Sequence, residues 1–229
     1  MRYFTMKKTI LFFLFSFFIC SLQAQKDSLQ LGDRYSEDQL YLSVSYAQFF
    51  NQPQVITKSG FSYGISAGFL KDFSLNKQGS LSFALGVGYG FDFFNHQLKV
   101  EEINGVTSFS NGVQLSRNVF KSSNLELPLE FRWRTSNAKK YDFWRIYGGV
   151  KFLYNLSNKF EFTDNGNAFN YKNVSSYRKW QYGLTLSAGF DEFNINVFYS
   201  LTPLFENANI NGETIDTGIL KFGLIFYIL

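Results

Sequence analysis

The chain has 229 residues, a formal net charge of +4, one cysteine and one histidine, and 20% of it is aromatic. The lysines and arginines are scattered and form no basic cluster or arginine stripe, which argues against a nucleic-acid partner. A single cysteine also supports neither a disulfide scaffold nor a cysteine-ligated metal site.

Residues 1–24 predict a cleaved signal peptide. MRYFTMKK supplies basic residues, TILFFLFSFFIC is a short apolar run, and SLQAQ places the small residue Ala24 before the cut. The apolar run is shorter than the about 20 residues of a membrane-spanning helix. The alternative is a lipoprotein signal acylated at Cys20, but Ile19 stands where that chemistry requires a small residue. Cleavage removes Cys20 and three basic residues, which lowers the net charge from +4 to +1.

The polar segment 25–38 is predicted to be a flexible periplasmic tail, and 39–229 a single domain of β-strands. Within that domain the side chains alternate between apolar and small or polar, as in LSFALGVGYGFDF (81–93). Alternation with a period of two indicates a strand with two different faces. The expected strands are 39–49, 60–71, 80–94, 123–135, 142–156, 177–190, 193–202 and 217–228.

Short and long links alternate between these strands. The links after the second, fourth and sixth strands are short, whereas those after the third, fifth and seventh are long. Asn-Gly favours hairpin turns because both residues tolerate positive φ, so some long links are expected to form hairpins beyond the main sheet. The Asn-Gly pairs in the long links are Asn104-Gly105, Asn111-Gly112, Asn165-Gly166 and Asn211-Gly212.

These patterns predict an all-β fold, an eight-stranded antiparallel up-and-down transmembrane β-barrel. A soluble β-sandwich also alternates, but strands of ten or more residues exceed the usual length. An even strand number with short periplasmic turns and long external loops is typical of outer-membrane barrels. The apolar face would contact outer-membrane lipid. Interfacial girdles would come from the aromatic residues Tyr46, Phe91, Phe93, Trp133, Trp144, Trp180 and Tyr199.

The segment LELPLEFRWRT (125–135) places leucines, Phe and Trp on one face and charged residues on the other. A barrel of eight strands has a bore that side chains can fill, so we expect a packed, polar lumen with a structural charge network rather than a gated conduit. Ion pairs between the fourth and fifth strands are expected, for instance Glu130 with Arg145. Pro128 cannot donate a ladder hydrogen bond, so a bulge or local break is expected there. The network residues are Glu126, Glu130, Arg132, Arg134, Arg145 and Lys151.

LELPLEFRWR also resembles the L-x-[IL]-P-[LI] strand of the PorT-like family of small outer-membrane barrels of Bacteroidetes. YGGVKF and YGLTLSAGF resemble the glycine-aromatic hairpins of that family. The resemblance implies an eight-stranded barrel in the cell outer membrane and no catalytic residue. One class of the family serves type IX secretion and gliding, but no residue here places the chain in it. The chain ends in Leu229 rather than Phe, which implies an assembly signal that is weaker or shared with Phe226 and Tyr227.

No catalytic, cofactor or metal site is predicted. A Ser–His–acid site would have to use His96, which is expected to be a solvated loop residue, and the acids of the loops lack EF-hand spacing. The prediction is a non-enzymatic barrel. Its role would be structural, or it would bind protein partners or serve assembly through its extracellular loops. A link to secretion is part of this hypothesis. The first candidate surface is VEEINGVTSFSNGVQL (100–115). A narrow transport pore and a lipid-modifying enzyme stay open as alternatives.

Overall fold

The computed structural model describes residues 38–56, 60–135 and 144–228. The predicted signal peptide (1–24) and all but the last residue of the predicted tail (25–38) lie outside these ranges. Within them, no helix is long and apolar enough to cross a bilayer. The strands are β1 (Gln39–Phe50), β2 (Tyr63–Ser74), β3 (Leu81–Asn95), β4 (Leu98–Ile103), β5 (Val106–Asn111), β6 (Arg117–Arg134), β7 (Trp144–Asp164), β8 (Asn167–Lys172), β9 (Trp180–Phe190), β10 (Phe193–Ser200), β11 (Asn209–Ile210), β12 (Glu213–Thr214) and β13 (Gly218–Ile228).

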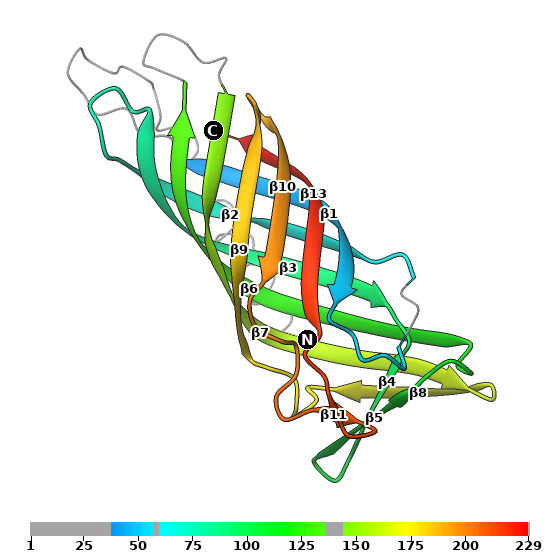
Figure 1. Cartoon of the computed structure of the whole chain (residues 1–229). Helices are drawn as coiled ribbons and strands as arrows, with labels where there is room; N and C mark the ends of the chain where they lie inside the picture. Colours follow the sequence, from blue (N-terminus) through cyan, green and yellow to red (C-terminus); the bar gives the residue numbers. More distant parts are fainter. Residues whose placement is uncertain (1–37, 57–59, 136–143, 229) are drawn as a thin grey trace, which may run out of the picture. The chain divides into compact units, whose positions relative to one another are not determined.

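Eight long strands pair edge to edge in a closed antiparallel ring (Figure 1). Their order is β1, β2, β3, β6, β7, β9, β10 and β13, and β13 pairs back with β1. A closed ring leaves no edge and lets the strands of the wall satisfy one another's backbone groups, as a bilayer requires. This confirms the predicted eight-stranded barrel and excludes the β-sandwich.

The two faces of the wall follow the alternation of the sequence. On β1, Leu40, Leu42 and Val44 are 50%, 42% and 49% exposed, whereas Tyr41 and Ser43 between them are buried. The same pattern of exposed apolar and buried small or polar side chains recurs on β2, β6 and β9. A continuous apolar outer surface of this size is typical of contact with lipid rather than water.

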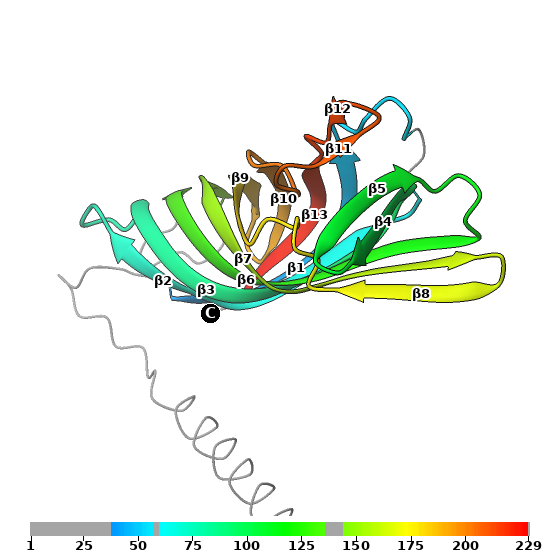
Figure 2. The ribbon, with the colours of Figure 1, turned by 90° about the horizontal axis from the view of Figure 1, so that it is seen from below.

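The links at one end of the barrel are short, and those at the other end are long and carry hairpins (Figures 1 and 2). We call these the turn end and the loop end. Three of the four Asn-Gly pairs form hairpin turns, and both residues of each have positive φ; Asn165 and Gly166, for example, have φ of 48° and 81°. The fourth pair, Asn111-Gly112, instead lies where β5 ends. The hairpins are β4–β5, β7–β8 and β11–β12.

β6 and β7 are longer than the sequence predicts. Their loop-end halves pair with each other beyond the predicted limits, and β8 extends this pairing to a third strand. The β3–β6 ladder is interrupted at Pro128 with the same register on either side, so the expected local break is present. The bulge lies elsewhere, between Ser123 and Asn124 against β7.

Outward-facing aromatic residues form a belt at each end of the wall. At the loop end, Tyr63 stacks on Phe93 with ring centroids 5.2 Å apart, and Tyr154 lies 4.8 Å from Trp180. Trp and Tyr side chains gather where a membrane meets water because each combines an apolar ring with a polar N–H or O–H group. The belt at the turn end comprises Trp133, Trp144, Phe190, Phe193 and Phe226.

Candidate functional site

The lumen is the most elaborate polar site of the described chain, and at the turn end it is closed by arginines. Asp72 accepts hydrogen bonds from Arg134 at 2.8 Å and from Arg132 at 3.4 Å. Arg132 also donates to Glu130 at 3.0 Å, and Arg134 donates to the carbonyl of Gly79 at 2.7 Å. Both guanidinium side chains are 0% exposed. Such a buried network is stable only when each charge has a partner.

The pairing at this end differs from the expected Glu130–Arg145 bridge. The register sets Arg145 opposite Arg134, while Glu130 lies opposite Gly149 and bonds to Arg132 of its own strand. Arg145 is buried, and its guanidinium carbon lies 5.8 Å from the ring centre of Tyr227. The stagger of the strands, which the sequence does not reveal, therefore decides which acid meets which base.

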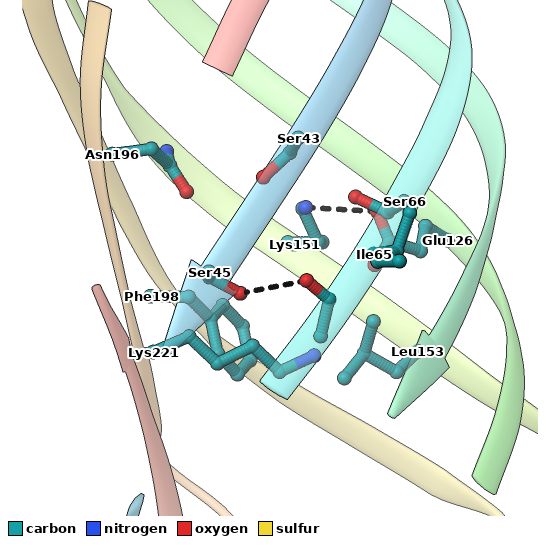
Figure 3. Close-up of a pocket in the computed structure, with 11 residues that line it drawn as sticks. Ser43, Ser45, Ile65, Ser66, Glu126, Lys151, Leu153, Asn196, Phe198 and Lys221 are labelled. Carbon is teal, nitrogen blue, oxygen red and sulfur yellow. Dashed lines mark hydrogen bonds and ion pairs between the residues drawn. The ribbon is translucent and has the colours of Figure 1, made fainter. Parts of the chain in front are cut away.

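The middle layer contains two further ion pairs. Lys151 donates to Glu126 at 2.8 Å, and the Tyr41 hydroxyl donates to the same carboxylate oxygen at 3.0 Å. Lys221 forms an ion pair with Asp92. Figure 3 shows Lys151 and Lys221 reaching into this layer from different strands. The cavity between them has a volume of about 10 Å³, enough for about one water molecule.

Small residues on the inner face of β3 make this packing possible. A Cβ added at Gly88 would lie 2.0 Å from the Tyr41 hydroxyl, and one at Gly90 would lie 2.6 Å from a carboxylate oxygen of Glu126. The alternating glycines of β3 therefore provide the space that the Tyr41–Glu126 contact occupies.

A chain of amide side chains leads from the middle layer toward the loops. Asn124 donates to Asp92 at 3.4 Å, Asn155 donates to Asn124 at 2.9 Å, and Asn158 donates to Asn155 at 3.0 Å. The side-chain oxygen Oδ1 of Asn158 then accepts a hydrogen bond from the backbone N–H of Val174 at 2.9 Å. The polar lumen is thus tied directly to the link between β8 and β9.

The loop end of the lumen is aromatic, so the expectation of a polar bore is wrong there. Phe49, Phe94, Phe120 and Phe160 form a continuous stack with centroid separations of 4.3, 5.5 and 4.5 Å and interplanar angles of 15–16°. All four rings are buried. Apolar residues of the loops pack on this stack and cover the bore at this end.

His96 lies inside this aromatic layer, and the expectation of a solvated loop histidine is wrong. Its ring meets Phe49, Phe120 and Phe160 edge-on, with centroids 6.0–6.4 Å apart. Neither ring nitrogen has a hydrogen-bond partner among the described residues. Burial lowers the pKa of His96 to about 3, because the apolar layer disfavours its charged form.

The six residues expected to form the lumen network all face the interior: Glu126, Glu130, Arg132, Arg134, Arg145 and Lys151. Sequence reasoning missed Asp72 and Lys221, and it gave Asp92 no role. Strand parity could have found all three, because each falls on the inward parity of its strand. Asp72 lies one residue beyond the strand end predicted from the sequence.

The acids of the loops do not converge on a cation site. Asp164 lies 3.8 Å from Lys99, Glu206 lies 3.3 Å from Arg178, and Glu213 accepts from a backbone N–H at 3.3 Å. Across the described ranges, no three His, Cys, Asp or Glu side chains come together as metal ligands would.

The closed ring, the apolar outer surface and the two aromatic belts define a class, the eight-stranded transmembrane β-barrel. Within that class, residues 23–206 match the family described as outer membrane protein beta-barrel domain, and the chain belongs to this family. Its location is therefore the outer membrane.

Solved structures similar to the chain include Ail, the attachment invasion locus protein of Yersinia pestis. That structure is 12% identical with a TM-score of 0.38, over 84% of this chain and 99% of Ail. The structure of Ail in complex with the heparin analogue sucrose octasulfate is 13% identical to the chain, with a TM-score of 0.40 over the same shares of the two chains. A mutant Rh. blastica porin is 8% identical to the chain, with a TM-score of 0.15, over 85% of this chain and 100% of the porin. No curated protein matches the chain. At these identities and TM-scores the likenesses assign no function.

Proposed function

We propose that the protein is a non-conducting, non-enzymatic barrel that anchors a platform of extracellular hairpins in the outer membrane and binds a protein partner through them. The observation that carries the proposal is the filled lumen. Buried arginines occupy the turn end, ion pairs the middle, and a phenylalanine stack the loop end. Because the side chains of the wall fill the lumen, the hairpins of the loop end are the surface at which a partner can bind.

The hairpin platform is braced rather than loose. Glu102 on β4 accepts hydrogen bonds from Thr107 of the same hairpin at 2.8 Å and from the backbone N–H of Ser175 at 2.9 Å, which ties the β4–β5 hairpin to the link between β8 and β9. At the tip of β4–β5, Ile103 and Val106 flank the turn and are 62% and 69% exposed. Apolar residues held exposed on a rigid support are typical of a contact surface.

The alternatives are less well supported by the geometry. A transport pore needs a continuous water path, whereas the middle cavity holds about one water molecule. A serine–histidine lipid-modifying enzyme would need a histidine in hydrogen-bond reach of a nucleophile. His96 is enclosed by phenylalanine rings instead.

Photo-crosslinking from the hairpin tip in intact cells tests the proposed binding role. A photoreactive residue at position 106 is expected to give discrete protein adducts, and one at the lipid-facing position 87 is expected to give none. Absence of protein adducts from both 103 and 106 would overturn the platform proposal, because these are strongly exposed apolar side chains of the braced hairpin.

We also propose that the chain is related to the PorT-like barrels of Bacteroidetes and has a role linked to secretion. The resemblance of Leu125–Leu129 to the strand of that family supports it. Deletion of the gene is expected to reduce the proteins exported to the medium. Unchanged export in the deletion strain, with the barrel detected in the wild-type membrane, would count against the link.

A further inference from the structure

Three lysines lie in one row across the sheet that extends beyond the barrel at the loop end. The register sets Lys121 of β6 opposite Lys159 of β7, and Lys159 opposite Lys172 of β8. Directly opposed residues of antiparallel strands point to the same face, and like charges in such positions repel. An arrangement that repels itself is stabilised by an anion placed on it.

The row belongs to the outer face of the wall. The intervening residues Phe160 and Phe162 are buried on the inner face, whereas the side chains of Lys121 and Lys159 are 31% and 32% exposed and Lys172 is exposed. The lysines therefore point away from the lumen, toward whatever surrounds the barrel.

The charge of this face is only partly balanced. Glu161 receives ion pairs from Lys121 at 3.0 Å, from Arg117 at 3.4 Å and from Lys159. Hydrogen bonds from Lys159, and then from Lys121, hold the pKa of Glu161 below its usual range, so it stays ionised. One carboxylate among four basic side chains, Lys172 included, leaves an excess of positive charge. A hollow of about 250 Å³ beside the row is lined in part by Arg117, Lys159 and Glu161.

The row lies at the border of the lipid-facing surface. Lys121 is the cross-strand neighbour of Phe93, which belongs to the aromatic belt of the loop end. On β7, Leu156 and Tyr154 precede Lys159 on the way out of the membrane, and Leu156 is 51% exposed. This is the level at which lipid headgroups lie, and basic residues near an anionic membrane surface are attracted to it.

We propose that this face of β6, β7 and β8 binds the phosphate groups of the phosphorylated glycolipid of the outer leaflet. The lysine row and Arg117 supply the positive charge, and the neighbouring belt contacts the acyl chains. This site is distinct from the hairpin tips, which point away from the barrel wall.

Native mass spectrometry of the detergent-released full barrel tests the proposal, with bisphosphorylated lipid A and its dephosphorylated counterpart as probes. The variant Lys159→Gln/Lys172→Gln is expected to bind the bisphosphorylated probe about 30-fold more weakly, since each basic residue near an anionic surface contributes about fivefold. The matched control Lys71→Gln/Lys77→Gln removes the same charge at the turn end and should bind as the wild type does. A heat-modifiable gel shift verifies that each variant is folded.

A second variant separates charge from shape. Lys159→Arg/Lys172→Arg keeps the charge and is expected to retain binding. The proposal is overturned if both probes bind equally, if the Gln variant binds as tightly as the wild type, or if inorganic phosphate displaces the lipid at equal concentration. The last result would identify a free-phosphate site.

Discussion

Glu126 shows how the lumen depends on single residues. Its carboxylate takes both the Lys151 ammonium and the Tyr41 hydroxyl, so Glu126→Gln leaves a buried cation without its partner. Removal of one member of a buried ion pair costs about 3 kcal/mol or more. We expect the free energy of unfolding, measured by urea titration of the barrel in lipid vesicles, to fall by about that amount.

The matched control is Glu126→Gln/Lys151→Met, which removes both charges. It should recover part of the loss, because the uncompensated charge has gone. A single Glu126→Gln variant as stable as the wild type would show that the pair does not stabilise the lumen.

His96 gives the barrel a defined response to pH. Its pKa in the folded chain is about 3, below the ordinary 6.5. The unfolded chain therefore takes up the proton first, and stability is full above pH 6.5 and falls as the pH decreases toward 3. The loss is about 1.4 kcal/mol per pH unit. Between pH 6.5 and pH 5, the wild type should lose about 2 kcal/mol more than His96→Leu in urea titrations. Parallel pH profiles of the two proteins would contradict the burial of a neutral His96.

At the scale of elements, the β7–β8 hairpin depends on its Asn165-Gly166 turn. Gly166 has φ of 81°, which an alanine adopts only with strain of about 1 kcal/mol. Gly166→Ala should therefore speed amide hydrogen exchange in β8 about fivefold. Exchange in the barrel strand β10 should not change. Equal acceleration in both strands would mean that the hairpin does not open independently.

The strands were predictable wherever the wall crosses the membrane, because lipid outside and a packed bore inside impose a period of two. The extensions of β6 and β7 were not predictable by the same rule. Beyond the hydrocarbon core of the membrane the pattern inverts: Lys121 and Lys159 face outward, while Phe120 and Phe160 face inward. The polar residues Lys121 and Ser122 were therefore predicted to lie in a loop, although they form part of β6.

For the whole molecule, the sequence predicted six of the charges that enter the lumen and an ion pair between β6 and β7, which Glu126 and Lys151 form. It missed Asp72 and Lys221, and it named the wrong partner for Glu130. The alternation along each strand predicts that Glu130, Arg132 and Arg145 face inward. The partner of each also depends on the stagger of the strands and on residues distant in sequence, such as Asp72. The aromatic layer around His96 was also missed. Its phenylalanines come from different strands and meet only when the barrel closes.

The two ends of the lumen are closed by different chemistry, charged at the turn end and aromatic at the loop end, and each closure is made of buried side chains. We infer that the described side chains leave no water path across the barrel. Single-channel recording of the purified protein in planar bilayers tests this directly. We expect a quiet bilayer after insertion, with insertion verified by protease protection of the reconstituted barrel. Steady ohmic currents that scale with the amount of inserted barrel would contradict it.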